Sequence, residues 1–68
     1  MKNIFDIVYN LWIEFEQEAD VYFYIQNPEK IDNYLDEIDF DFLQVKDSKS
    51  QYTIKRLFIE RFDKILEV

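Results

Sequence analysis

The chain contains no cysteine, no histidine and no glycine, and its 68 residues include a single proline. Without cysteine it has neither a disulfide nor a thiolate metal site, and without histidine it lacks the commonest neutral metal ligand and general base. Without glycine, the backbone loops that cradle phosphate groups are excluded as well. These absences remove the best-known kinds of nucleotide, metal and nucleophilic site.

The polar residues that are present do not form a catalytic pattern. Ser48 and Ser50 have no histidine to act as their base. The carboxylates of Glu37, Asp39 and Asp41 are spaced as in a calcium-binding loop, but Phe42 follows where such a loop requires glycine. We therefore expect no enzyme, no metal site and no cofactor.

The length predicts a single acidic domain over residues 1–68, near the lower size at which one core holds a chain folded without disulfides or metals. Seven Phe, five Tyr and one Trp can supply that core, because each aromatic side chain buries a large apolar area. The first residues do not read as a signal peptide, and no apolar run is long enough to span a bilayer. We expect a cytoplasmic protein.

Charge is distributed unevenly along the chain, whose net charge is −7. Residues 1–45 hold eleven acids and two bases, whereas residues 46–68 hold four acids and six bases. The stretch 14–41 has ten acids against one base, Lys30. An acidic surface repels nucleic acids and anionic lipids, so we expect a basic protein partner, with no direct binding of nucleic acid or membrane.

Two segments have the periodicity of amphipathic helices. From about Asn3 to Glu18, apolar residues recur at three- and four-residue steps, and Asn3 is placed to cap the helix. The end of the chain, from about Leu57, shows a second apolar stripe with charges opposite. A third helix is predicted from Asn27-Pro28-Glu29 to about Ile38, because Asn suits the cap and Pro the first helical position.

Three short segments favour β-structure. Val21–Ile25 is a continuous run of β-branched and aromatic residues, which predicts a buried strand. Alternation of acids and phenylalanines from Asp39, and of polar and apolar residues over 51–55, predicts a hairpin. Its turn has no glycine, so Ser48-Lys49-Ser50-Gln51 is alternatively a capping box that starts one long final helix.

Together these elements predict an α+β domain in the order helix, strand, helix, strand, strand, helix, with a three-stranded mixed sheet. The middle helix would cross over between two parallel strands. The alternative is an all-α three-helix bundle, which the lack of glycine for strand turns favours.

The most compact acidic region, 29–41, is the predicted partner-binding site. Its residues are Glu29, Asp32, Tyr34, Asp36, Glu37, Asp39 and Asp41. Glu14, Glu16, Glu18 and Asp20 join them if the fold brings the polar sides of these segments together. Tyr34 would supply an aromatic contact among the charges, as is typical of interface centres.

Size and charge together resemble those of DNA-mimic inhibitors from phages and mobile elements, which include anti-restriction and anti-CRISPR proteins; no motif contributes to this resemblance. It implies an inhibitor that occupies a basic, nucleic-acid-handling site on its partner, in the host cytoplasm if a phage encodes it. One alternative is a structural or accessory subunit, or a homodimer, whose acids serve solubility. Another is an immunity protein that neutralises a basic nuclease toxin.

Overall fold

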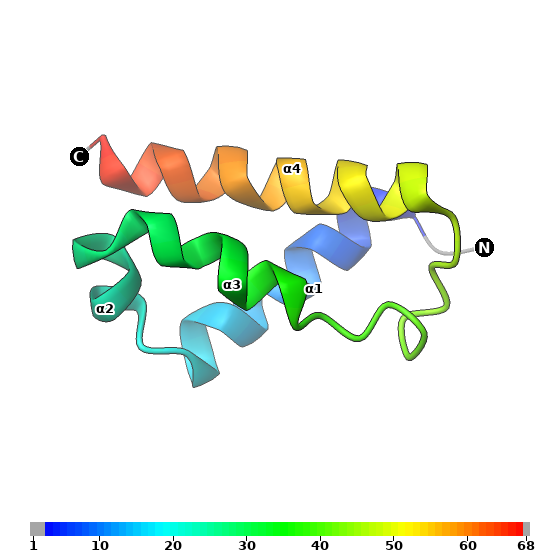
Figure 1. Ribbon diagram of the computed structural model, residues 1–68, viewed down its shortest axis with the longest axis horizontal. Coiled ribbons are helices and arrows are strands. Elements are labelled where there is room, and N and C mark those ends of the chain that lie inside the picture. The colour runs from blue at the N-terminus through cyan, green and yellow to red at the C-terminus, as the bar shows by residue number, and fades with distance from the viewer. Residues whose placement is uncertain (1–2, 68) are drawn as a thin grey trace.

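The protein is a small bundle of helices in the computed structural model, which describes residues 3–67 (Figure 1). The elements are α1 (Ile4–Glu18), α2 (Val21–Gln26), the 3₁₀ helix η1 (Pro28–Lys30), α3 (Ile31–Asp36) and α4 (Ser48–Leu66). Residues 3–67 contain no strand, so the predicted α+β fold with its three-stranded sheet is wrong and the all-α alternative fits. Residues 1–2 and 68 of the expected domain lie outside the described part.

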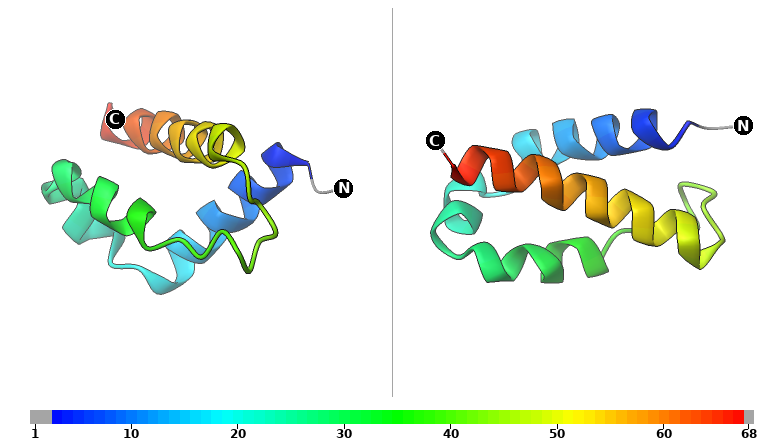
Figure 2. Two further views of the ribbon diagram at one scale, coloured as in Figure 1. Left: turned by 45° about the vertical axis from the view of Figure 1, so that its right-hand side comes forward. Right: turned by 90° about the horizontal axis from the view of Figure 1, so that it is seen from above.

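The long helices α1 and α4 lie side by side and run in the same direction. Helix α3 lies beside this pair and runs in the opposite direction (Figures 1 and 2). An irregular segment, 37–47, then returns the chain to the start of α4. The molecule measures 34 × 20 × 19 Å. None of the helices in the described residues has both the length and the apolar content needed to cross a membrane.

The core is built around Phe15, whose side chain is completely buried. Its ring centroid lies 5.3 Å from that of Trp12 on the same helix, 5.3 Å from Phe58 on α4 and 5.0 Å from Tyr34 on α3. The pairs with Phe58 and Tyr34 meet edge to face, the geometry that aromatic quadrupoles prefer. Helices α1, α3 and α4 therefore meet at a single ring.

The predicted strand Val21–Ile25 is helix α2, and none of its residues is buried. Asp20 decides the local structure, because its side chain accepts a hydrogen bond from the Phe23 N–H at 3.1 Å and caps the helix. A continuous apolar run has no period of its own and suits helix as well as strand.

The predicted hairpin is also absent from the described residues. Its first strand, from Asp39, is a series of turns in which Asp39 Oδ1 accepts a bond from the Phe42 N–H at 3.0 Å. The chain turns at Gln44, whose φ of 61° is left-handed, a conformation that a sequence without glycine must give to another residue. Phe42, predicted to point inward, is 80% exposed.

The second predicted strand, 51–55, lies within α4, as the capping alternative anticipated. The cap itself is one residue earlier than the predicted box: the Asp47 side chain accepts a bond from the Ser50 N–H at 2.9 Å. Hydrogen bonding from the side chain and backbone of Ser50 lowers the pKa of Asp47. The side-chain amide of Gln51 donates a hydrogen bond to the Val45 carbonyl at 3.0 Å, and this bond connects the helix to the preceding loop.

The other two helix starts were predicted more closely. Asn3 caps α1 by accepting a bond from the Phe5 N–H at 2.8 Å. Pro28 occupies the first position of η1, but the Asn27 side chain makes no cap and instead donates to the Phe23 carbonyl of α2 at 3.0 Å. The helix expected to reach Ile38 ends at Asp36.

Replacing Phe15 with alanine should destabilise the protein far more than the same change at Phe42. Phe15 is completely buried, so Phe15→Ala should lower the free energy of unfolding by about 3–5 kcal/mol. Phe42→Ala, at an 80% exposed position, should change it by less than about 0.5 kcal/mol. Urea denaturation followed by circular dichroism measures both. Equal losses would contradict the central role of Phe15.

Glycine should have opposite effects at two glutamines. Gln44→Gly removes a side chain from a left-handed residue and should raise the free energy of unfolding by up to about 1 kcal/mol. Gln17→Gly, at an exposed position inside α1, should lower it by about 1 kcal/mol. Relative to the wild type, the urea midpoint of Gln44→Gly should rise and that of Gln17→Gly should fall. If both midpoints shift in the same direction, the left-handed conformation of Gln44 is not strained.

Candidate protein-binding groove

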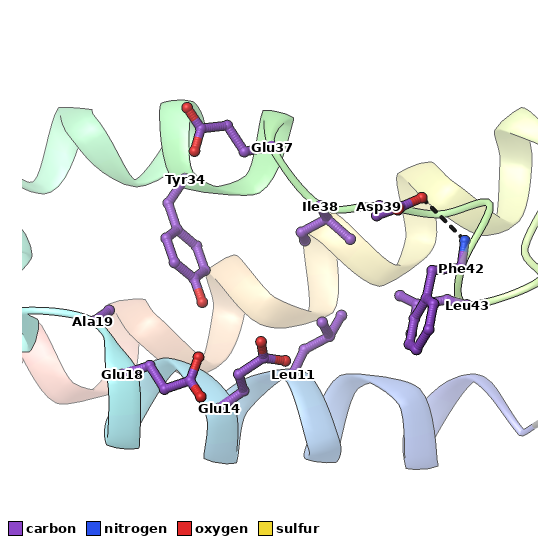
Figure 3. A pocket seen from close by; sticks show the side chains of 10 residues that line it. All are labelled: Leu11, Glu14, Glu18, Ala19, Tyr34, Glu37, Ile38, Asp39, Phe42 and Leu43. Atoms are coloured by element: carbon purple, nitrogen blue, oxygen red, sulfur yellow. Dashed lines mark hydrogen bonds between the residues drawn. The ribbon is translucent and has the colours of Figure 1, made fainter.

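A groove of ≈ 480 Å³ runs between α1 and the segment formed by α3 and the start of the following loop (Figure 3). Four aliphatic residues line it: Leu11, Ala19, Ile38 and Leu43. The remaining lining residues are Glu14, Glu18, Tyr34, Glu37, Asp39 and Phe42. We call this feature the acidic groove.

The carboxylates of the acidic groove come from both of its walls. Glu14 and Glu18 are one helical turn apart on α1, and both are exposed. Glu37 and Asp39 follow α3 on the opposite wall, where the Glu37 side chain points away from α1 (Figure 3). None of the lining residues in the described part of the chain is basic, so the groove presents four acids that no cation within it neutralises.

A second hollow of ≈ 300 Å³ extends the acidic groove toward the start of α1. The two share Leu11, Glu14 and Leu43. Asp6 and Asn10 also line the second hollow, so polar residues follow one another along α1 at four-residue steps: Asp6, Asn10, Glu14 and Glu18. On a helix this spacing repeats about every 6 Å, which places the whole row along one side of α1.

Tyr34 connects the acidic groove with the core. Its ring packs against Phe15, with the centroids 5.0 Å apart, while its hydroxyl points from α3 toward Glu14 and Glu18 on α1 (Figure 3). Partial burial raises the pKa of Tyr34 above 10.0, and the negative charges of Glu14, Tyr24 and Glu18 raise it further. The phenol therefore stays neutral and presents a hydrogen-bond donor among carboxylates.

Of the predicted binding residues, the structure brings Tyr34, Glu37 and Asp39 to the acidic groove. Asp36 lies on the other side of α3, where it forms an ion pair with Lys55 of α4 at 3.3 Å. Glu29, Asp32 and Asp41 are exposed but line neither hollow. The acidic region 29–41 is thus divided between two sides of the bundle.

Sequence reasoning left Glu14 and Glu18 outside the predicted site and missed Phe42. The four-residue spacing of Asp6, Asn10, Glu14 and Glu18 was a usable signal, since it marks one side of a helix. Phe42 gave no such signal. Its exposure depends on the turn that Asp39 fixes by accepting the Phe42 N–H, and neighbouring residues in the sequence do not reveal that bond.

Several cations of α4 are engaged away from the acidic groove. Lys55 pairs with Asp36, and its ammonium lies 5.9 Å from the centre of the Phe40 ring. The Arg56 guanidinium is 3.7 Å from Glu60 on the same helix. The Arg61 guanidinium lies 5.4 Å from the Trp12 ring centre, a cation–π contact over the edge of the core. These three cations therefore lie outside the acidic groove.

Within residues 3–67, no three acidic side chains come together in a way that could hold a metal ion. Asp39 instead uses a carboxylate oxygen to accept the Phe42 N–H. The groove residues offer carboxylates, one phenol and apolar surface, but no nucleophile paired with a base. Carboxylates in such an arrangement can hold a cationic group.

Neutralising both groove glutamates of α1 should lower the pKa of Tyr34. In Glu14→Gln/Glu18→Gln the two charges are gone, yet the value should stay above 10.0 because burial, the larger cause, remains. Glu29→Gln/Asp32→Asn removes the same charge outside the groove and should leave the Tyr34 pKa nearly unchanged. Titration of the tyrosine Cζ resonance by NMR measures it. Equal shifts in both variants would show that the effect is one of net charge.

No protein-family model, no curated protein and no solved structure matches the chain. Its function must therefore be inferred from the arrangement of the side chains described above.

Proposed function

We propose that this chain is a small acidic binding protein that occupies a basic, nucleic-acid-handling site on a partner protein and inhibits it. The observation that carries the proposal is that Glu14, Glu18, Glu37 and Asp39 line one groove that contains no basic lining residue in the described part of the chain. Uncompensated carboxylates attract a cationic surface and repel anionic ones, so a basic protein is the favoured partner.

Carboxylates on both walls of the groove support a partner that normally holds phosphate groups. Along α1 the row from Asp6 to Glu18 has a polar residue about every 6 Å, but only three of its four members are acids, so its charge is sparser than the charge of about one per 3.4 Å on each DNA strand. The second wall of the groove, with Glu37 and Asp39, adds two carboxylates to these three.

Inhibition follows from competition, because a site filled by this protein is closed to its nucleic acid. A phage or mobile-element inhibitor of the anti-restriction or anti-CRISPR kind, acting in the host cytoplasm, is the leading form of the proposal. An immunity protein directed at a basic nuclease toxin has the same chemistry and differs in its partner. Neither form requires catalysis, a metal or a cofactor.

A structural or accessory role is the second candidate, and the exposed apolar surface of α2 favours it. Tyr22, Phe23 and Ile25 are 67%, 42% and 39% exposed on this short helix. Apolar side chains gathered on one element are typical of contacts with another protein, including a second copy of the chain. In this role the acids would serve solubility, and binding would depend little on salt.

Salt should separate the two candidates. Affinity for the partner captured from a host lysate should fall by more than about tenfold between about 0.01 M and 0.15 M salt, because screening shortens the range of charge interactions. Adding this protein should also release nucleic acid from the captured partner. An electrophoretic mobility shift assay of the complex between the partner and nucleic acid measures this release. A partner held equally well at both salt concentrations would contradict the inhibitor and support the accessory role.

A further inference from the structure

We infer that the acidic groove and the hollow that extends it form a binding site for a basic amphipathic helix of the partner, which packs against α1 and α3 as a further helix of the bundle. This inference rests on the proposed function and makes it more specific, because it names the partner segment that is bound. Three features of the groove carry it: its apolar lining, the spacing of its acids and an exposed phenylalanine at its rim.

The apolar lining is left open because α3 is too short to cover α1. With only Ile31–Asp36 helical, α3 lies opposite the second half of α1, and an irregular loop lies opposite the first half (Figure 3). Leu11 of α1, which is 9% exposed, and the half-buried Leu43 of that loop line both hollows. An added helix would cover the part of these side chains that is still exposed, in the way that helices of a bundle bury one another's apolar stripes.

The polar row on α1 matches the repeat of a partner helix. Asp6, Asn10, Glu14 and Glu18 recur about every 6 Å over a length of about 18 Å. Lysines or arginines placed every four residues on a neighbouring helix have the same repeat, so the three carboxylates of the row can each face a cation. On the opposite wall, Asp39 can contact a cation on the other side of that helix, whereas the Glu37 side chain points away from α1.

A helix suits this groove better than an extended segment does. An extended peptide normally binds by adding a strand to the edge of a sheet, where its backbone groups find hydrogen-bond partners. Residues 3–67 contain no strand and offer no such edge. A helix satisfies its backbone internally and contributes only side chains to the contact.

Phe42 provides an apolar contact at the rim. It lines the acidic groove, yet its side chain is 80% exposed, because the turn held by Asp39 directs it away from the core. An aromatic side chain among carboxylates can pack on the aliphatic stems of lysine and arginine and attract their charged heads. A basic helix with an apolar stripe offers both kinds of group.

The test uses three synthetic peptides of about 18 residues, long enough to follow the row on α1. All three contain the same leucines, lysines and alanines. The first has leucines and lysines at helical spacing, the second is scrambled, and the third alternates leucine and lysine as a strand would. Binding of each labelled peptide to the full chain is measured by fluorescence anisotropy. The helical peptide should bind at least about tenfold more tightly than the other two.

Two charge-reversal variants locate the binding. Glu14→Lys/Glu18→Lys changes the groove, whereas Glu29→Lys/Asp32→Lys changes the net charge equally at exposed residues that line neither hollow. The affinity of the groove variant for the helical peptide should be lower than that of the wild type by at least about tenfold, and the affinity of the control variant should be lower by less than about threefold. Circular dichroism checks that both are folded, and Glu14→Gln/Glu18→Gln replaces the groove variant if lysine unfolds it.

Three outcomes would each overturn the proposal that the groove binds a helix. They are equal affinity for the helical and scrambled peptides, equal losses of affinity in the two variants, and a preference for the strand-like peptide. The salt-sensitive, nucleic-acid-displacing interaction with the captured partner would be unaffected by these outcomes, so the proposed function would stand. If instead the captured partner proves insensitive to salt, the inhibitor fails, and with it the basic-helix partner that this inference names.

Discussion

The arrangement of this protein depends on the packing of aromatic rings around Phe15. The ring centroid of Phe15 is 5.3 Å from Phe58 on α4, 5.0 Å from Tyr34 on α3 and 5.6 Å from Tyr24 on α2. The Trp12–Phe58 and Tyr34–Phe58 ring pairs, with centroids 5.1 Å and 6.1 Å apart, join the same helices beside it. In a chain this short, with no disulfide among the described residues, the helices are positioned relative to one another largely by these aromatic contacts.

The same packing shapes the surface that we propose as functional. Tyr34 lies against Phe15 on one side and reaches Glu14 and Glu18 on the other, so the separation of α1 and α3 is set by a residue that belongs to both core and groove. A change in the core would therefore alter the spacing of the two acidic walls. Stability and binding are coupled at Tyr34 rather than located in separate regions.

The sequence was sufficient to predict the elements whose signals are local. The apolar period and Asn3 cap of α1, the apolar stripe of α4 and the placement of Pro28 all depend on residues within a turn or two of one another. The strand predictions were wrong because runs such as Val21–Ile25 have no decisive period. Their conformation depends on whether a pairing strand exists elsewhere and on single capping bonds, such as that of Asp20.

The residues that line the groove were predictable to a similar degree. Tyr34, Glu37 and Asp39 were expected in a site and lie together at the groove, whereas Asp36 pairs with Lys55. Which side of a short helix faces a neighbour depends on how α3 packs between α1 and α4, and that packing is a property of the whole bundle. Charge density along the chain indicates acids but not their grouping in space.

The acids have a second effect, because their charge keeps copies of the protein from associating through their exposed aromatic side chains. Phe5, Tyr9, Tyr22, Phe42 and Tyr52 are each more than half exposed. Mutual repulsion between like-charged molecules keeps such surfaces apart at neutral pH, where the net charge is −7. At the sequence pI of ≈ 4.3 the net charge is zero and that repulsion is lost, so we expect a concentrated solution to be least stable against association near this pH. The range of pH in which the protein stays dispersed is thus set by its carboxylates, independently of its fold.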